Sequence, residues 1–556
     1  MKNGISNRTV KLSGLLFVVI LFVLSSACTQ ENVRATKITL TATKKITPSV
    51  TASATTPAPT IPPTRTSEPV KVLEVDPEDL RGETVQFWHI WSGEAGDVVE
   101  EMVQMFNESN QWGIEVKPVF KESLDHMYEG VNRAIEAGDT PDLVTAYLHQ
   151  AQTWDGEKEL VDLNIYVDDP LWGLDSEEQE DFYPVFWEYD VSDGKRLGIP
   201  AQRSGMLLYY NATWAADLGF EDAPTTHEQF NEQSCAAAYA NRLDEETGND
   251  VTGGWIVSTD HAAMLGWIYS NGGDILESDA DASEEKVYNF NNPEIEETFT
   301  FLRSLYDEGC AWFPESQYPE KEFANRLGLF STGSVTGIPY QDAAFKVTRN
   351  RDQWIVMPFP SSVGESTIDV YGPSYEIMSS YPERELAAWL FIKWMIAPEQ
   401  QAKLIEKTGA YPLRESTLDY LEEYKSRNSQ WAEALRMIRR AKTEPGHQSW
   451  SVVRWALSDA ARQLFMYYFT VDEVPKLLEF LDKTAFELHV GPDVSGVYDT
   501  PTFTPSPSPT ATITPTPSDT PTNTPPPSNT VVPTKTLTPT ATITPSLGAA
   551  SKTPPR

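Results

Sequence analysis

Residues 84–147 constrain the fold most, because strand and helix patterns alternate along them. Residues 84–91 are apolar and aromatic, which is typical of a strand. Apolar side chains then recur at every fourth position from 98 to 106, the spacing of one helix face. Further strand patterns follow at 114–119 and 141–147. Strands that alternate with helices at this spacing predict a parallel α/β sheet.

The second helix of this pattern has recognisable ends. Ser123 is suited to cap its first turn, and Gly138 is suited to stop it. Ligands of parallel α/β sheets bind beyond the carboxyl ends of the strands. The sequence therefore directs attention to 89–94 and 147–150.

Two segments of biased composition flank the block that can fold. Residues 28–75 are predicted to be a tether and residues 496–556 a tail, both rich in Thr and Pro. Such segments cannot bury enough apolar surface to offset the entropy lost on ordering. The block between them is long enough for two or more domains.

The charge balance limits the partners of the block. The chain has 81 acidic and 43 basic residues, and the two flanking segments hold few of the acids. A surface this acidic repels nucleic acid and anionic lipid, so we expect no nucleic-acid partner. After the N-terminal apolar run, no stretch is long and apolar enough to cross a bilayer.

The N-terminus has the pattern of a secretory signal. Basic residues precede the apolar run 15–24, and small residues lead to Cys28. The run resembles a bacterial lipoprotein signal (residues 1–27), in which Cys28 receives the lipid. It departs from that pattern where Ser25 replaces the usual Leu. The alternative is an ordinary secretory signal cut after Ala27.

Cys235 and Cys310 remain once Cys28 is assigned. An even pair in an oxidising compartment favours a disulfide, and two buried free thiols are the alternative. The acidic loops lack calcium-binding spacing, and no nucleotide, metal-hydrolase or nucleophile motif is present. We therefore expect no metal, no cofactor and no catalytic residues.

Six short runs of the block resemble the extracellular solute-binding proteins of ABC importers, in the branch that binds carbohydrates and glycerol 3-phosphate. Each run is short, but their order and spacing cover the whole block. They are Phe87–Glu94, Ala137–Asp142, Gly198–Ser204, Leu208–Asn211, Trp389–Trp394 and Gly409–Pro412.

The resemblance implies a periplasmic-binding-protein-like fold of two α/β lobes, with hinge strands and a ligand cleft between the lobes. The first lobe is expected at 76–203 plus 370–412, and the second at 204–369 plus 413–495. The crossings between them are expected near 200–206 and 370–372.

Ten residues are candidates to contact the ligand. Sugar sites use aromatic faces against the ring and polar groups against its hydroxyls. Tyr340 and Trp450 are the preferred aromatics, because both follow chain breakers where the resembling proteins place aromatics. Trp91, Glu94 and Arg203 have structural alternatives: a core position, helix-terminus electrostatics and a carboxylate of the other lobe, respectively. The full set is Trp91, Glu94, Tyr147, Gln202, Arg203, Asn271, Tyr340, Gly372, Tyr375 and Trp450.

The resemblance implies a non-enzymatic, monomeric receptor on the extracellular face of the cell membrane. It would capture a carbohydrate or related polyol for ABC permease subunits and would touch the membrane only through its lipid. The alternatives are a lipid-anchored carbohydrate-active enzyme, and an adhesin or sensor component.

Overall fold

The structure is a computed structural model that describes residues 73–277 and 287–491, all of which belong to the compact unit Val70–Arg556. The predicted signal, nearly all of the predicted tether, Cys28 and the predicted tail lie outside the described residues. None of the helices within the described ranges is long and apolar enough to cross a membrane.

The first sheet contains the predicted alternation. It has five strands in the order β2-β1-β3-β13-β6. β1 pairs in parallel with β2 and β3, whereas β13 is antiparallel to β3 and β6. The strands are β1 (Thr84–His89), β2 (Glu115–Phe120), β3 (Leu143–Ala146), β6 (Ile199–Pro200) and β13 (Ser374–Ile377). The predicted strands are confirmed, and the predicted α/β class with them.

The helices between these strands also form where predicted. α1 (Gly93–Ser109) buries Met102 and Phe106. α2 (Leu124–Ala137) is capped by Ser123, whose side chain accepts a hydrogen bond from the backbone N–H of His126. It ends at Gly138, which has the left-handed φ of 69°.

The second sheet is built from later strands. Its order is β14-β12-β7-β10-β8-β9, and β11 pairs with β7. β7 is antiparallel to β10, β11 and β12, and β10 is parallel to β8. The strands are β7 (Ser204–Asn211), β8 (Gly253–Ile256), β9 (Ala311–Trp312), β10 (Gly328–Ser334), β11 (Trp354–Met357), β12 (Ile368–Tyr371) and β14 (Ala441–Thr443).

The chain crosses between the two sheets three times: the first two crossings lie at the predicted places, and the third leads from β13 to β14. It leaves the first sheet after Pro200 and enters the second at Ser204, and it returns between Tyr371 and Ser374. The first and second crossings contact each other. Gly372 has a φ of +149°, and a Cβ there would lie 2.1 Å from the carbonyl oxygen of Gln202. Only glycine fits this close approach.

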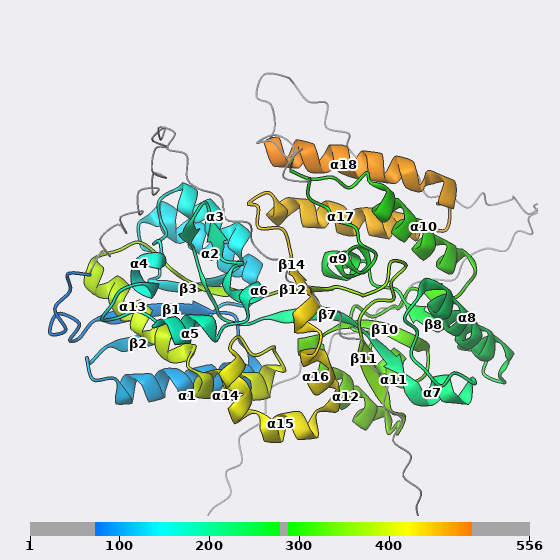
Figure 1. Cartoon of the computed structure of the whole chain (residues 1–556), viewed down its shortest axis with the longest axis horizontal. Coiled ribbons are helices and arrows are strands. Elements are labelled where there is room, and N and C mark those ends of the chain that lie inside the picture. Colours follow the sequence, from blue (N-terminus) through cyan, green and yellow to red (C-terminus); the bar gives the residue numbers. More distant parts are fainter. Residues whose placement is uncertain (1–72, 278–286, 492–556) are drawn as a thin grey trace, which may run out of the picture. The chain divides into compact units, whose positions relative to one another are not determined.

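Helices cover both sheets (Figure 1). α13 (Pro382–Met395) is buried around most of its girth and packs with α1 against the first sheet. The second core includes α9 (His261–Ser270), α10 (Pro293–Asp307), α17 (Trp450–Leu464) and α18 (Val474–Val490). The other helices of six or more residues are α3 (Leu148–Gly156), α7 (Ala212–Asp217), α8 (His227–Leu243), α12 (Ile338–Thr348), α14 (Pro398–Thr408), α15 (Glu422–Arg427) and α16 (Ser429–Leu435).

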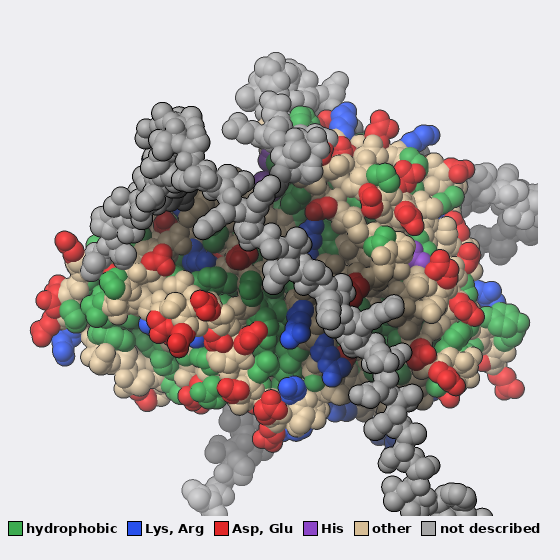
Figure 2. All heavy atoms as spheres, viewed as in Figure 1, with side chains coloured by type: hydrophobic (Ala, Val, Ile, Leu, Met, Phe, Trp, Pro, Cys, Tyr) green, Lys and Arg blue, Asp and Glu red, His purple; other side chains and the backbone are tan. Residues whose placement is uncertain are grey.

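Acidic side chains are spread over the face seen in Figure 2, as the composition predicts. Their dispersion is typical of a well-hydrated body rather than of one acidic binding patch. The limits predicted for the two lobes remain a prediction, although the first two crossings lie close to the predicted boundaries between the lobes.

Candidate functional site

A cavity of about 1590 Å³ lies against the second sheet. All its lining residues fall between Met206 and Tyr467, so they come from the segments predicted to form the second lobe and from Tyr371 at the second crossing. They belong to β7, the β8–α9 connection, the segment 313–321, the β10–α12 region and α17. Ligand cavities for small molecules are commonly about 300–1,000 Å³, so this one suits a larger ligand.

One wall of the cavity is a single face of α17. The lining residues Trp455, Ser458 and Arg462 are spaced by three and four positions, which places them on one side of a helix. Phe465 continues this spacing at the helix end. The opposite face carries Leu457 and other core residues. α17 thus contributes some residues to the second core and others to the cavity wall.

A second wall comes from α12. Its lining residues Tyr340, Ala343, Ala344 and Val347 again share one helix face. Figure 1 shows α17 and α12 on opposite sides of β7 and β10 in that view. Both helices are thus placed by the second sheet, and the cavity runs along faces of both.

Large aromatic side chains in this cavity are exposed. Tyr340 is 69% exposed and Trp455 is 46% exposed. Arg454 lies with its guanidinium carbon 5.0 Å from the centre of the Trp455 ring, and His261 contacts the same ring edge-on. These contacts hold the indole in place while part of it faces solvent. Exposed, positioned aromatic faces are what a site needs to stack on a sugar ring.

Polar groups accompany the aromatics. Ser258, Thr259, Thr332, Ser334, Thr336 and Gln341 line the cavity with hydroxyl or amide groups. Asp260 lies at the start of α9, where one carboxylate oxygen accepts the N–H of Ala262 at 3.0 Å. Its other oxygen lies 3.6 Å from Nδ1 of His261. Hydroxyls, amides and one carboxylate beside aromatic faces can bind polyhydroxylated ligands.

A buried polar network supports this edge of the cavity. Glu444 accepts the indole N–H of Trp450 at 3.0 Å, and its other oxygen lies 3.4 Å from Nε2 of His261. Burial would lower the pKa of His261, but the hydrogen bond to Glu444 and the charge of that carboxylate outweigh it and raise the pKa. Burial opposes ionisation of Glu444, yet the hydrogen bond and charge of His261 outweigh it and lower the Glu444 pKa. Both shifts favour the charged forms of the two side chains.

Of the ten predicted ligand residues, Tyr340 alone lines this cavity. Trp91 and Glu94 lie near the carboxyl end of β1, as expected. Trp91 is buried and donates its indole N–H to the side-chain oxygen of Gln202 at 2.7 Å. Glu94 is exposed and pairs with Lys407 at 3.1 Å. The burial of Trp91 fits its core alternative, and Glu94 lies in the first turn of α1, as its helix-terminus alternative requires.

Three candidates at the crossings are enclosed by protein. Arg203 is fully buried and pairs with Asp190 at 2.7 Å, a carboxylate of its own predicted lobe rather than one of the other lobe. Tyr375 is 1% exposed and packs on Phe87 and Trp91. Gly372 is buried at the close approach of the two crossings. None of the three faces the cavity in this structure.

Tyr147 lies between the predicted lobes. Its ring stacks on His149, and the guanidinium of Arg454 from α17 lies 5.7 Å from its centre. Burial raises the pKa of Tyr147, with a smaller contribution from the charge of Glu444, so its hydroxyl is neutral at physiological pH. Tyr147 is thus placed where the two sheets' helices meet, outside the cavity lining.

Two candidates of the predicted second lobe, Trp450 and Asn271, lie in the core and do not line the cavity. Trp450 is fully buried as the first residue of α17 and stacks on Tyr288. The turn before Trp450 does not expose its ring, because the ring packs on Tyr288 and its indole N–H donates to the buried Glu444. Asn271 is 2% exposed; its amide donates to the carbonyl of Trp267, and its oxygen accepts from Ser362.

The sequence reasoning missed Trp455. The available signal was the spacing of Trp455, Ser458 and Arg462 on the face of α17 opposite to its apolar residues. Phe313, Tyr318 and Tyr467 were missed as well, since they lie in irregular segments that carry no periodic signal.

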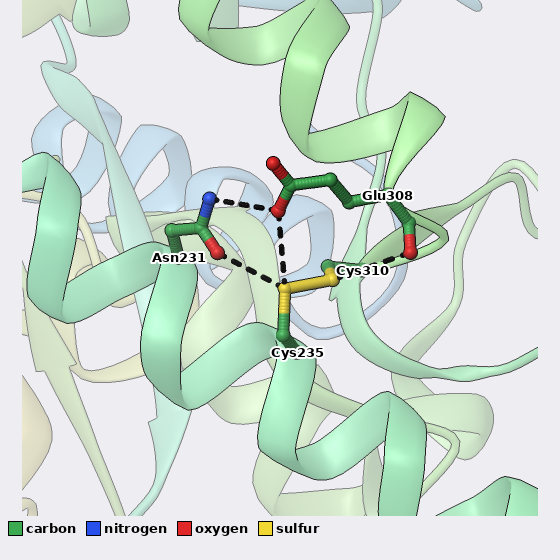
Figure 3. Close-up of a disulfide and its surroundings, with 4 residues drawn as sticks. All are labelled: Asn231, Cys235, Glu308 and Cys310. Atoms are coloured by element: carbon green, nitrogen blue, oxygen red, sulfur yellow. Dashed lines mark hydrogen bonds between the residues drawn. A yellow bond between two sulfur atoms is a disulfide. The ribbon is translucent and has the colours of Figure 1, made fainter.

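The predicted disulfide is confirmed. Cys235 of α8 and Cys310, which precedes β9, are bonded (Figure 3). Asn231 and Glu308 lie beside them, and the Asn231 amide donates to the Glu308 carboxylate at 3.0 Å. The bond ties α8 to the strand edge of the second sheet, close to the start of the cavity-lining segment 313–321.

Residues 101–433 match the family model described as bacterial extracellular solute-binding protein. The match spans more than half of the 556 residues. The chain belongs to this family. Solute-binding proteins of this family bind small molecules outside the cytoplasm for ABC importers and are typically non-enzymatic.

Several curated relatives of this solute-binding protein share one name. The sn-glycerol-3-phosphate-binding periplasmic protein UgpB of Salmonella paratyphi A is 23% identical over 352 residues, which is 61% of this chain and 76% of the relative. UgpB of Escherichia coli K12 is 23% identical over 357 residues, with the same coverage.

Solved structures establish the two-lobed fold of this solute-binding protein. The cyclic α-maltosyl-1,6-maltose binding protein of Arthrobacter globiformis matches with a TM-score of 0.60 at 20% identity, covering 73% of this chain and 99% of that one. UgpB of Mycobacterium tuberculosis in complex with glycerophosphocholine matches with a TM-score of 0.59 at 17% identity, with the same coverage. The predicted periplasmic-binding-protein-like fold is confirmed.

Proposed function

We propose that this protein captures a neutral carbohydrate outside the cell and delivers it to the permease subunits of an ABC importer. The cavity beside the second sheet supports the proposal, because it presents exposed aromatic faces among hydroxyl and amide groups. We call Asp260, Tyr340, Tyr371 and Trp455 the inner site. Tyr340 and Trp455 stack on sugar rings, and Asp260 accepts hydrogen bonds from sugar hydroxyls.

Closure over the ligand follows from the fold. Tyr147 and α3 belong to the predicted first lobe and lie next to α17 and the segment before it. Hydrogen bonds join α3 to that segment. The side-chain amide of Gln152 donates to the carbonyl of Gly446 at 2.6 Å, and Gln448 donates to Thr153 at 3.0 Å. We propose the lobe limits 76–203 plus 370–412 and 204–369 plus 413–495 as the moving bodies, with the crossings as the hinge.

The location proposed is the extracellular face of the cell membrane. The protein is anchored there by lipid at Cys28 and held off the surface by the Thr/Pro-rich tether, as a monomer. The acidic body, with 81 acidic against 43 basic residues, supports a position away from anionic lipid.

A phosphorylated polyol is the second candidate ligand. The curated relatives are named for glycerol 3-phosphate. Lys321 and Arg462 are cations in the cavity lining that could bind a phosphate. Asp260, Glu315 and Glu320 lie in the same lining and oppose an anion. The carbohydrate is therefore preferred.

A thermal-shift screen separates the two candidates. The full chain is incubated with neutral oligosaccharides in one arm and with glycerol 3-phosphate and glycerophosphodiesters in the other. A ligand at a hundred times its dissociation constant stabilises the folded state by about 2.7 kcal/mol, which is easily measured. A shift in the phosphate arm alone would replace the carbohydrate proposal. Product analysis after long incubation tests the enzyme alternative, since a transport receptor returns the sugar intact.

A further inference from the structure

The cavity extends beyond the inner site. Trp455 and Phe465 both line the cavity and are ten residues apart along α17 and its C-terminal end, which is roughly 15 Å along the helix axis. The lining continues past the helix end to Met466 and Tyr467. A single sugar ring cannot bridge this length, so the cavity is longer than the inner site requires.

The far part of the cavity has its own aromatic side chains. Tyr467 is 88% exposed and Tyr318 is 69% exposed, and both line the cavity together with Phe313. Exposed aromatics gathered in one place mark interaction sites, whereas single scattered ones do not. These residues come from the end of α17 and from the segment 313–321, two pieces of chain that the fold brings to the same cavity.

These side chains are held by the structure. Phe313 contacts Phe465 and Tyr306 edge-on, with ring centres 5.6 and 6.1 Å apart. The buried guanidinium of Arg303 donates to the carbonyls of Leu464 and Met466 at 2.8 and 2.9 Å. Arg303 thereby fixes the chain that presents Tyr467. A preorganised aromatic surface loses little entropy when a ligand stacks on it.

We infer that Phe313, Tyr318, Met466 and Tyr467 form an outer track that binds the rings of a linear oligosaccharide beyond those held by the inner site. The protein then captures chains of several sugars in preference to mono- or disaccharides. This inference rests on the proposed carbohydrate function and specifies the length of its ligand.

A sugar chain suits the track better than a protein partner does. The track is continuous with the inner site, and Ser316, Gln317 and Ser458 add polar groups to the same lining. The cavity volume of about 1590 Å³ exceeds that of common small-molecule sites, which are about 300–1,000 Å³. A protein partner would favour a flat surface, whereas these aromatics line a hollow.

The test is calorimetric titration of the full chain with malto- and cello-oligosaccharides of two to seven units. For the wild type, affinity should rise with chain length. Tyr467→Ala and Tyr318→Ala, combined, should lower the affinity for the longest bound chain by about tenfold, with a loss that shrinks as the chain is shortened. Tyr340→Ala should lower the affinity at every length.

Tyr468→Ala is the matched control, because Tyr468 is exposed beside Tyr467 but is absent from the cavity lining. It should bind every chain as the wild type does. Affinity that is independent of length, or equal losses at all lengths in the double variant, would overturn the track while leaving the carbohydrate function standing. Absence of binding to all these glucans would count against both. Light scattering of the double variant tests the remaining possible occupant of the track, a second copy of the chain. A change in oligomeric state would assign the aromatics to that contact and overturn the track.

Discussion

The guanidinium of Arg203 and the carboxylate of Asp190 lie 2.7 Å apart, and both side chains are almost completely buried. Arg203 also donates to the carbonyls of Gly372 and Pro373, at 3.0 and 2.7 Å. One side chain thus ties the first crossing between the sheets to the second. Because its Nη1 and Nη2 groups both donate to protein acceptors, Arg203 is a structural residue of the hinge region in this conformation.

Breaking this pair should be costly. Asp190→Asn leaves the guanidinium buried without its counter-charge, so we expect a loss of about 3–5 kcal/mol in the free energy of unfolding. Glu433→Gln is the control, because Glu433 and Arg436 are also 2.7 Å apart but lie in solvent, where a pair contributes at most about 1 kcal/mol. Urea unfolding of both variants measures the difference. Similar losses in the two variants would contradict the hinge role.

The disulfide should stabilise the second core. Cys235 and Cys310 are 75 residues apart, and closing a loop of that length contributes up to about 4 kcal/mol on the chain-entropy model. The variant with both cysteines changed to serine should unfold at lower denaturant concentration. Reductant should destabilise the wild type and leave the double variant unaffected. Two thiols that alkylate in the unreduced, denatured wild type would show that the bond is absent.

Stability should fall below neutral pH because of a buried histidine. Burial lowers the pKa of His149 from 6.5 to about 3, with a further contribution from the charge of Arg454. Below pH 6.5 the unfolded chain therefore binds a proton that the folded protein refuses, and stability is lost as the pH falls. Between pH 7 and pH 5 the loss is about 2 kcal/mol.

The variant His149→Gln isolates this contribution. It removes the titrating group, so its unfolding free energy should fall less than that of the wild type between pH 7 and pH 5. His126→Gln is the control, because His126 is exposed. If His149→Gln and the wild type lose the same stability over this range, His149 is not the group responsible.

The proposed lipid anchor depends on Cys28. A labelled fatty acid should enter the wild-type protein in a bacterial host, and Cys28→Ala should prevent its incorporation. The variant should then be released from the membrane or remain unprocessed. A wild type that takes up no label would favour the ordinary secretory signal cut after Ala27.

Much of the fold could be predicted because its signals are local. The cap at Ser123 and the stop at Gly138 act within one turn of α2, and the apolar spacing of α1 needs only its own residues. The crossings were predicted from a family resemblance, and Gly372 explains physically why the second one is placed where it is.

The site could be predicted only in part, because burial is decided by distant chain segments. Trp450 and Trp455 lie on the same helix, and five positions rotate a side chain by about 140° around the axis. That rotation puts Trp450 against Tyr288 and Glu444, and Trp455 into the cavity. Which face of α17 packs into the core depends on the second sheet, and no local sequence pattern reveals how that sheet is placed.

These two tryptophans provide the most discriminating prediction. Trp455→Ala and Tyr340→Ala each remove an exposed aromatic face from the inner site, so binding of the carbohydrate found in the screen should weaken by about tenfold or more. The melting temperature of the empty protein should stay close to that of the wild type, because neither ring is fully buried.

Trp450→Ala should behave in the opposite way. It leaves a cavity in the second core and a carboxylate without its indole donor, and truncating a buried aromatic costs about 3–5 kcal/mol. Calorimetric titration and thermal unfolding of the three variants give both quantities. If Trp455→Ala collapsed the melting temperature while the sugar bound the folded fraction with unchanged affinity, Trp455 would belong to the core and the inner site would lose one of its two stacking faces.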